Sequence, residues 1–155
     1  MFKYPPELLN ALTRRVGGTV SADDYINWAS SALERGLDTP SLRILAGLPS
    51  STWRSEAEPY FDRALDELRI CVGDKGEVLR EHAKQIASKI IDGELTAEIG
   101  ADLIEREVVS PLGHPKDLQV WCYLSGNLDP VTFATLTAPE LKRVVHEEAL
   151  KLLGE

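Results

Sequence analysis

The chain contains little of what disulfide scaffolds and membrane proteins need. Only two of its 155 residues are cysteines, Cys71 and Cys122, and they lie far apart in the sequence. This small number excludes a disulfide framework and is typical of the reducing cytoplasm, so we expect both thiols in the hydrophobic core. No apolar run reaches the roughly 18 residues of a membrane span, and residues 1–6 lack the apolar stretch of a signal peptide. We therefore expect a cytoplasmic protein that does not bind membranes.

Motifs for catalysis and metal binding are also missing. The sequence has no Gly-x-Ser-x-Gly elbow, no P-loop, no His-Glu-x-x-His and no Cys-x-x-Cys. None of the histidines, His82, His114 and His146, has an acidic residue three positions before it, as a di-iron helical bundle requires. We therefore predict no enzyme activity, no catalytic residue, no metal ligand and no cofactor. We expect His82 to pack on the apolar face of a helix.

Basic residues are too few for a nucleic-acid-binding surface. The formal net charge is −8, from 17 lysines and arginines against 25 acidic residues, so we expect no nucleic acid as a direct ligand. The distribution of charge is more informative than its total. Residues 1–54 carry a net charge of +1, whereas residues 92–107 carry −5. More than half of the net charge thus lies in about a tenth of the chain.

A short joint built around glycine is the most regular feature of the sequence. It occurs at residues 18–22, 93–97 and 126–130, with a looser copy at 36–40. In each, a glycine suits the left-handed position after a helix, and a Ser, Thr or Asp then suits the N-cap of the next helix. The joints therefore predict helices that follow one another closely.

Apolar residues recur at intervals of three and four between these joints, and no window shows sustained alternation. The pattern predicts helices at 6–16, 22–35, from 40, 55–72, 78–91, 97–109, 116–124, 129–136 and after 137. The predicted fold class is all-α, a single domain over residues 1–155 that forms an irregular bundle or stack of about seven to nine short antiparallel helices. A degenerate helical repeat is an alternative, which the unequal intervals between the joints disfavour.

The acidic segment 92–107 is the first candidate binding site. Glu98, Asp102 and Glu105 follow one another at i, i+4 and i+7, which places them on one helix face. Asp92 and Glu94 directly precede that helix, where its dipole favours negative charge. Two interpretations stay open: a solvated face that keeps the protein soluble, or a docking surface for a basic protein partner.

Trp53 is the second candidate. It lies beside Arg54 in a polar stretch, and this composition is typical of an interface anchor. The alternative is that its ring folds back as a lid on the core. Trp28 and Trp121 lie on helical apolar stripes and are expected in the core.

Two stretches carry a resemblance to known proteins. The sequence Leu-Glu-Arg-Gly-Leu-Asp-Thr-Pro-Ser-Leu-Arg-Ile-Leu-Ala-Gly-Leu at 33–48 and the block Ile-Asp-Gly-Glu-Leu-Thr-Ala-Glu-Ile-Gly-Ala at 91–101 resemble segments of small, uncharacterised bacterial all-helical proteins. Some proteins of this kind look like immunity proteins of secreted toxins. The resemblance supports the all-helical fold. The small size, the missing catalytic motifs and the acidic segment 92–107 predict a protein-binding module, most concretely an immunity or antitoxin-type inhibitor that binds a basic toxin, such as a nuclease, through its acidic helix face. The alternative is a structural or regulatory helical adaptor subunit without a toxin partner.

Overall fold

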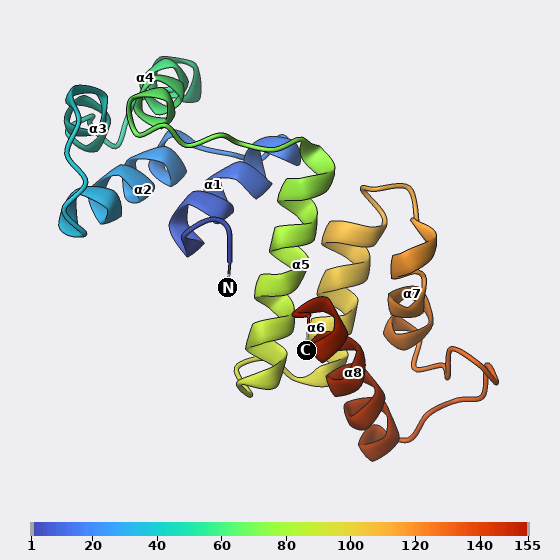
Figure 1. The fold of residues 1–155 in the computed structure, drawn as a ribbon. Coiled ribbons are helices and arrows are strands. Elements are labelled where there is room, and N and C mark those ends of the chain that lie inside the picture. Colours follow the sequence, from blue (N-terminus) through green and yellow to red (C-terminus); the bar gives the residue numbers. More distant parts are fainter. Residues whose placement is uncertain (1, 155) are drawn as a thin grey trace. The chain divides into compact units, whose positions relative to one another are not determined.

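The computed structural model describes residues 2–154, and it confirms the all-α fold class (Figure 1). Within these residues there is no strand, and the one β-type pairing is an isolated bridge between Leu128 and Thr135. No helix of the described chain combines the length and the apolar character needed to cross a membrane. Contacts divide the chain into two compact units, Lys3–Val78 and residues 79–154, and the boundary falls within one helix. The expectation of a single domain stays a prediction.

The N-terminal unit contains four helices, α1 (Pro6–Val16), α2 (Ala22–Glu34), α3 (Pro40–Ala46) and α4 (Arg54–Glu67). Helix α2 contacts each of the other three. Its Tyr25 and Trp28 are fully buried and pack against Phe61 of α4, with ring centroids 4.3 Å and 5.1 Å apart. This aromatic cluster joins the helices of the unit, and it confirms Trp28 as a core residue.

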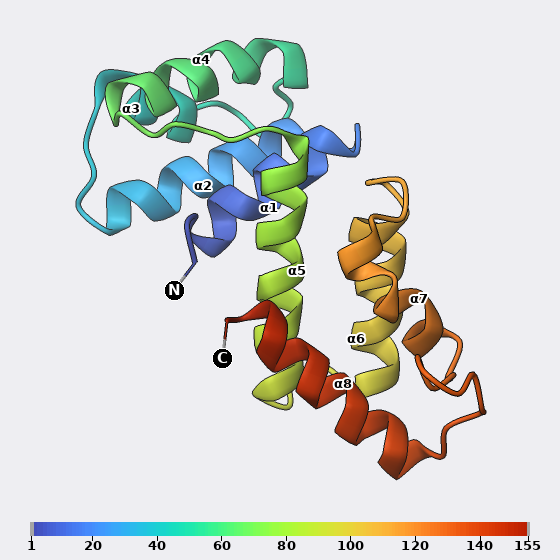
Figure 2. The same ribbon diagram turned by 45° about the vertical axis from the view of Figure 1, so that its right-hand side comes forward.

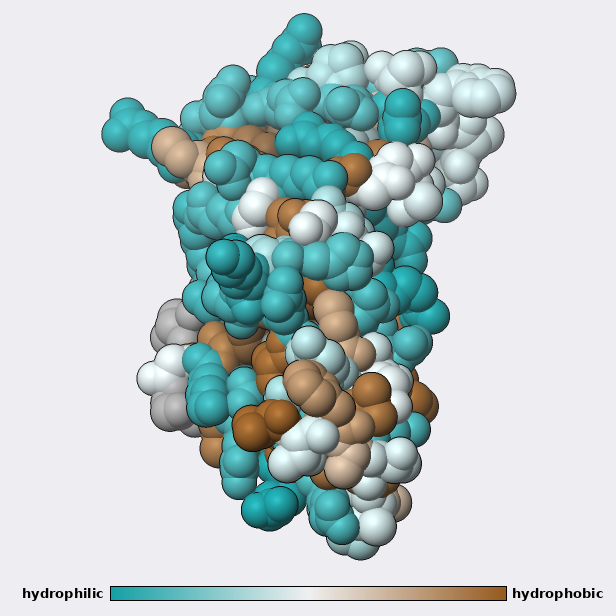
Figure 3. Space-filling view, turned by 90° about the vertical axis from the view of Figure 1, so that its right-hand side faces the viewer, coloured by the Kyte–Doolittle hydropathy of each residue, from teal (hydrophilic) through white to brown (hydrophobic). Residues whose placement is uncertain are grey.

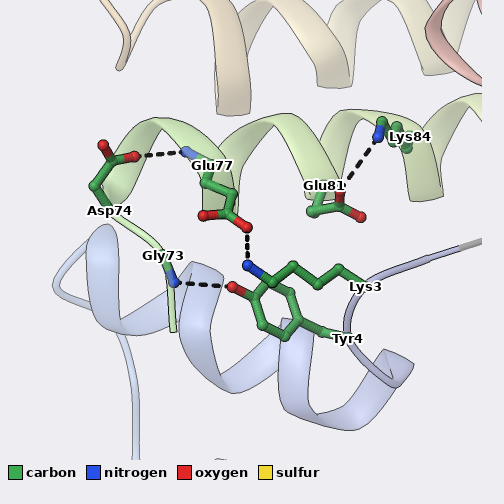
Figure 4. A network of polar contacts seen from close by, with 7 residues as sticks. All are labelled: Lys3, Tyr4, Gly73, Asp74, Glu77, Glu81 and Lys84. Atoms are coloured by element: carbon green, nitrogen blue, oxygen red, sulfur yellow. Dashed lines mark hydrogen bonds and ion pairs between the residues drawn. The ribbon is translucent and has the colours of Figure 1, made fainter. Parts of the chain in front are cut away.

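Polar contacts fix the start of α5 (Lys75–Ile91) within the N-terminal unit (Figure 4). The backbone N–H of Gly73 donates to the Tyr4 hydroxyl at 3.0 Å, and the Lys3 ammonium is bonded to the Glu77 carboxylate. The Asp74 carboxylate accepts the backbone N–H of Glu77 at 2.9 Å, which satisfies a donor of the first helical turn. The sequence places the start of this helix at 78, but the Asp74 cap lets it begin at Lys75.

The C-terminal unit is built on the rest of α5, together with α6 (Ala97–Ile104), α7 (Val120–Ser125) and α8 (Ala138–Leu152). A π-helical turn, Glu105–Val109, extends α6, and a 3-10 turn, Lys116–Leu118, precedes α7. Helix α6 contacts both α7 and α8, as Figures 1 and 2 show. Trp121 is buried, as expected.

Three of the four joints have the predicted geometry. Gly18, Gly36 and Gly93 have φ values of 75°, 90° and 82°, and Ser21, Thr39 and Thr96 stand at the N-caps that follow. At the remaining joint, the prediction that Gly126 takes the left-handed position is wrong. Its φ is −91°, and Asn127 takes the left-handed position with φ 59°. Asparagine tolerates this conformation better than most other residues with a Cβ.

The predicted helix at 129–136 does not form. The Asp129 carboxylate accepts the backbone N–H groups of Val131 and Thr132 at 2.8 Å and 2.9 Å, as an N-cap would. The chain then turns back instead of continuing, because Phe133 has φ 60° and the Asp129 N–H donates to the carbonyl of Ala134. The β-branched residues here favour this extended turn over a helix.

One further boundary and two burial predictions are corrected. Helix α4 ends at Glu67, not at 72, because Arg69 adopts φ 57° and the N–H of Ile70 bonds back to Leu65. Cys71 lies in the segment after this stop and is exposed, and Cys122 is only half-buried. Ile99 of α6 is 53% exposed, because this helix turns its small residues inward.

Candidate functional site

The joint between α5 and α6 places three unpaired carboxylates at the surface. Helix α5 ends at Ile91, Gly93 reverses the chain, and the Thr96 hydroxyl caps α6 by accepting the N–H of Ile99 at 3.2 Å. Asp92, Glu94 and Glu98 are exposed, and within residues 2–154 their carboxylates make no hydrogen bond or ion pair. We call these three residues the acidic joint. Their charges are free for an external partner.

A cavity of about 750 Å³ opens at the acidic joint. Asp92 and Glu98 line it from the joint and from α6, and Lys142 and His146 line it from α8. Most of the remaining lining is apolar: Ile90, Ile91, Leu95, Ala97, Ala138 and Pro139. The opening thus combines an apolar interior with two carboxylates on the side of the joint and two basic side chains on the side of α8. On the side of the joint, the carboxylates suit a side chain that has an aliphatic stem and a cationic end.

Two other acidic residues of segment 92–107, Asp102 and Glu107, have partners within the chain. Asp102 is exposed and forms an ion pair with Arg106 at 3.2 Å, one turn further along. Glu107 lies 3.0 Å from the imidazole of His82, which is partly buried on α5, as expected for a histidine at a helix contact. The structure therefore divides the predicted docking surface: the acidic joint stays free, while Asp102 is partly neutralised.

Trp53 is 74% exposed, so the lid interpretation is wrong. It stands at the N-cap position of α4 in the N-terminal unit, where its side chain makes no capping hydrogen bond. Arg54 beside it lies 4.0 Å from Glu58. A large aromatic side chain held in water without a partner has the exposure that an interface anchor requires.

Exposed apolar residues also occur in the segment after α7. Val131 and Phe133 are 83% and 59% exposed, and the Phe133 ring lies 5.3 Å from that of Tyr123. In Figure 3, apolar surface, coloured tan and brown, gathers over the C-terminal unit. The sequence pattern missed these residues because it assigned them to a helix.

Glu105 lies away from the acidic joint, in a cluster with His114 and Cys122. The three side chains come from the π-helical turn, the loop before the 3-10 turn and α7. Their ligand atoms all lie within 4.8 Å of one another, and Cys122 Sγ is 3.5 Å from His114 Nδ1. No sequence signal marks this cluster, since its members are 9 and 8 positions apart and match no motif.

The Cys122 thiol is kept protonated by its surroundings. Burial raises its pKa, and the negative charge of Glu105 raises it further. A nucleophilic cysteine needs the opposite shift, because the thiolate is the reactive form. The cluster therefore lacks the electrostatics of a cysteine-histidine catalytic pair.

Comparison with protein-family models finds no matching family. Comparison with curated proteins and with solved structures finds no significant match to either.

Proposed function

We propose that this protein is a protein-binding module whose docking surface is the acidic joint and the cavity beside it. The observation that carries the proposal is the coincidence of three unpaired carboxylates with an opening that has an apolar interior. Charges that have no partner within a chain favour association with a surface of opposite charge. The partner would present lysine or arginine side chains, at least one of which enters the cavity.

The most concrete form of this proposal is an immunity or antitoxin-type inhibitor of a basic toxin, such as a nuclease. The resemblance of residues 91–101 to small bacterial helical proteins supports it, and this block contains the acidic joint. An inhibitor needs no catalytic group of its own, because occluding the basic surface of the toxin is sufficient. Trp53 is a second candidate contact in the N-terminal unit.

The test uses the full chain as bait in a lysate of its native host. The unaltered chain should capture a basic protein that is toxic when produced alone, and Asp92→Lys/Glu98→Lys should lose it. A matched control, Glu34→Lys/Asp66→Lys, changes the net charge equally at two exposed acids without a partner in residues 2–154. Capture by the acidic-joint variant at the level of the control would contradict the proposal, as would an acidic partner.

A second candidate function is that of a structural or regulatory adaptor subunit. The exposure of Val131 and Phe133 favours it, because apolar side chains of this size are enriched where subunits meet. Under this alternative, Val131→Ser/Phe133→Ser abolishes assembly with the partner, whereas Asp92→Lys/Glu98→Lys leaves it intact. Analytical ultracentrifugation of each variant with the captured partner distinguishes the two functions.

A further inference from the structure

We propose that Glu105, His114 and Cys122 form a zinc-binding site. The proposal does not depend on the acidic joint, and it differs from the sequence-based expectation of no metal ligand. It rests on the identity of the three donors, on the distances between them and on the backbone that positions them.

The donor set is that of zinc. A thiolate sulfur, an imidazole nitrogen and a carboxylate oxygen are the three ligand types that Zn²⁺ takes in proteins. Magnesium and calcium prefer oxygen alone, and a thiolate beside an imidazole disfavours both. Three protein ligands leave the fourth tetrahedral position for water or for a group from a bound molecule.

The distances suit one shared ion. With usual Zn–S and Zn–N bond lengths and a tetrahedral angle, sulfur and nitrogen bound to the same ion lie about 3.6 Å apart. Cys122 Sγ and His114 Nδ1 are separated by 3.5 Å. Glu105 supplies the third ligand atom, within 4.8 Å of the other two, so a small rotation of its side chain completes the set.

The backbone brings the donors together in an unusual way. Glu105 begins the π-helical turn, in which the N–H of Ser110 donates to the Glu105 carbonyl at 2.9 Å. Such turns are rare and are frequently found at functional sites. His114 adopts φ 56°, a conformation that costs energy for a residue other than glycine. Its N–H is held by the carbonyl of Val109 at 2.9 Å, so the loop closes back onto the π-helical turn.

The cluster is accessible to an ion from solvent. His114 is exposed, and Glu105 and Cys122 are half-buried. Solvent therefore reaches at least one of the three donors directly. The site would accept an external ligand, such as a carboxylate or an imidazole, without rearrangement of the helices.

The first test is alkylation of the full chain, stripped of metal with a chelator, by iodoacetamide with and without Zn²⁺. Zinc should slow alkylation of Cys122 by more than about tenfold, because a bound sulfur is shielded from the reagent. Cys71, exposed and outside the cluster, serves as the internal control and should react at one rate throughout. Equal rates for Cys122 in both conditions would overturn the proposal.

The second test replaces ligands. His114→Ala and Glu105→Gln should weaken zinc binding, measured by calorimetry, by at least about 100-fold, whereas His146→Ala, outside the cluster, should leave it unchanged. Circular dichroism checks that each variant is folded. Should a variant fail to fold, the cobalt complex of the unaltered chain decides: a sulfur-to-cobalt charge-transfer band at one equivalent supports the site, and absence of the band overturns it.

Discussion

Trp53 is a large aromatic residue whose surroundings depart from what its chemistry favours. An indole ring that is 74% exposed forgoes the burial that stabilises Trp28 and Trp121, both 1% exposed. Nothing in the described chain covers it, so its removal has little effect on folding. As an interface anchor, Trp53 would contribute to the free energy of binding a partner and not to the free energy of folding.

Trp53→Phe should remove the part of the tryptophan fluorescence that iodide quenches, because the two remaining indoles are shielded from water. Trp53→Ala should change the free energy of unfolding by less than about 0.5 kcal/mol, since surface substitutions rarely change it by more. Stern–Volmer quenching and urea unfolding measure the two effects. Quenching that is unaffected by Trp53→Phe would mean that the ring is buried.

Gly100 shows why one position in α6 must stay small. A Cβ at this position would overlap the side chain of Ile90 on α5, where the two helices approach closely. Gly100→Ala should therefore reduce the free energy of unfolding by about 1–3 kcal/mol, measured by urea denaturation. In the Ile90→Ala background the same change should cost less, because the overlapping atoms are gone. An equal cost in both backgrounds would show that packing is not the cause.

At the scale of elements, the end of α4 stabilises the start of α3. The Glu67 carboxylate accepts the backbone N–H of Ser41 at 3.0 Å and its hydroxyl at 2.6 Å. These hydrogen bonds favour the ionised form and hold the pKa of Glu67 below its usual value of 4.5. A carboxylate of α4 thus accepts hydrogen bonds from the first turn of α3, a helix that lies elsewhere in the sequence.

Because the pKa of Glu67 is lower in the folded protein than in the unfolded chain, its contribution is present above about pH 4.5 and is lost as the pH falls through the lowered folded pKa. Glu67→Gln should consequently be less stable than the unaltered protein at pH 7, and the difference in Tm should shrink towards pH 3. Asp66→Asn is the control, because the Asp66 side chain lies next to Glu67 in the sequence and makes no hydrogen bond within residues 2–154. A Tm difference independent of pH would contradict this role.

The helical elements could be predicted where a local signal decides them. Gly18, Gly36 and Gly93 end helices because the left-handed position excludes most other residues, and the caps that follow lie within the same few residues. The stop at Arg69 carries no such signal, although backbone hydrogen bonds from Arg69 to Asp66 and from Ile70 to Leu65 close the helix end there. Asp129 carries the signal of a helix start, yet the same hydrogen bonds also stabilise a turn, and the sequence alone does not separate the two.

The candidate sites also differ in whether a local sequence signal identifies them. The acidic joint was found from the sequence because Asp92, Glu94 and Glu98 are close along the chain. The Glu105, His114 and Cys122 cluster was not, because it requires the π-helical turn and the loop to bring three separate segments together. The exposure of Trp53 likewise could not be predicted, because it depends on how distant segments of the chain pack around the ring.

At the scale of the whole molecule, the charge is unevenly divided. Residues 79–155 carry a net charge of −5, the same as segment 92–107 alone, so the remainder of that part of the chain is neutral. The net charge of this part of the chain is therefore that of segment 92–107, and the acidic joint holds three of the six carboxylates of the segment. A basic partner would be attracted to this region over distances of about a Debye length.

The proposed function is tested most directly by the dissociation constant of the captured partner for Asp92→Lys/Glu98→Lys, compared with Glu34→Lys/Asp66→Lys. The account predicts that the acidic-joint variant binds at least about tenfold more weakly than the control at low ionic strength, and that the difference narrows as salt screens the charges. Equal dissociation constants for the two variants at low salt would contradict it.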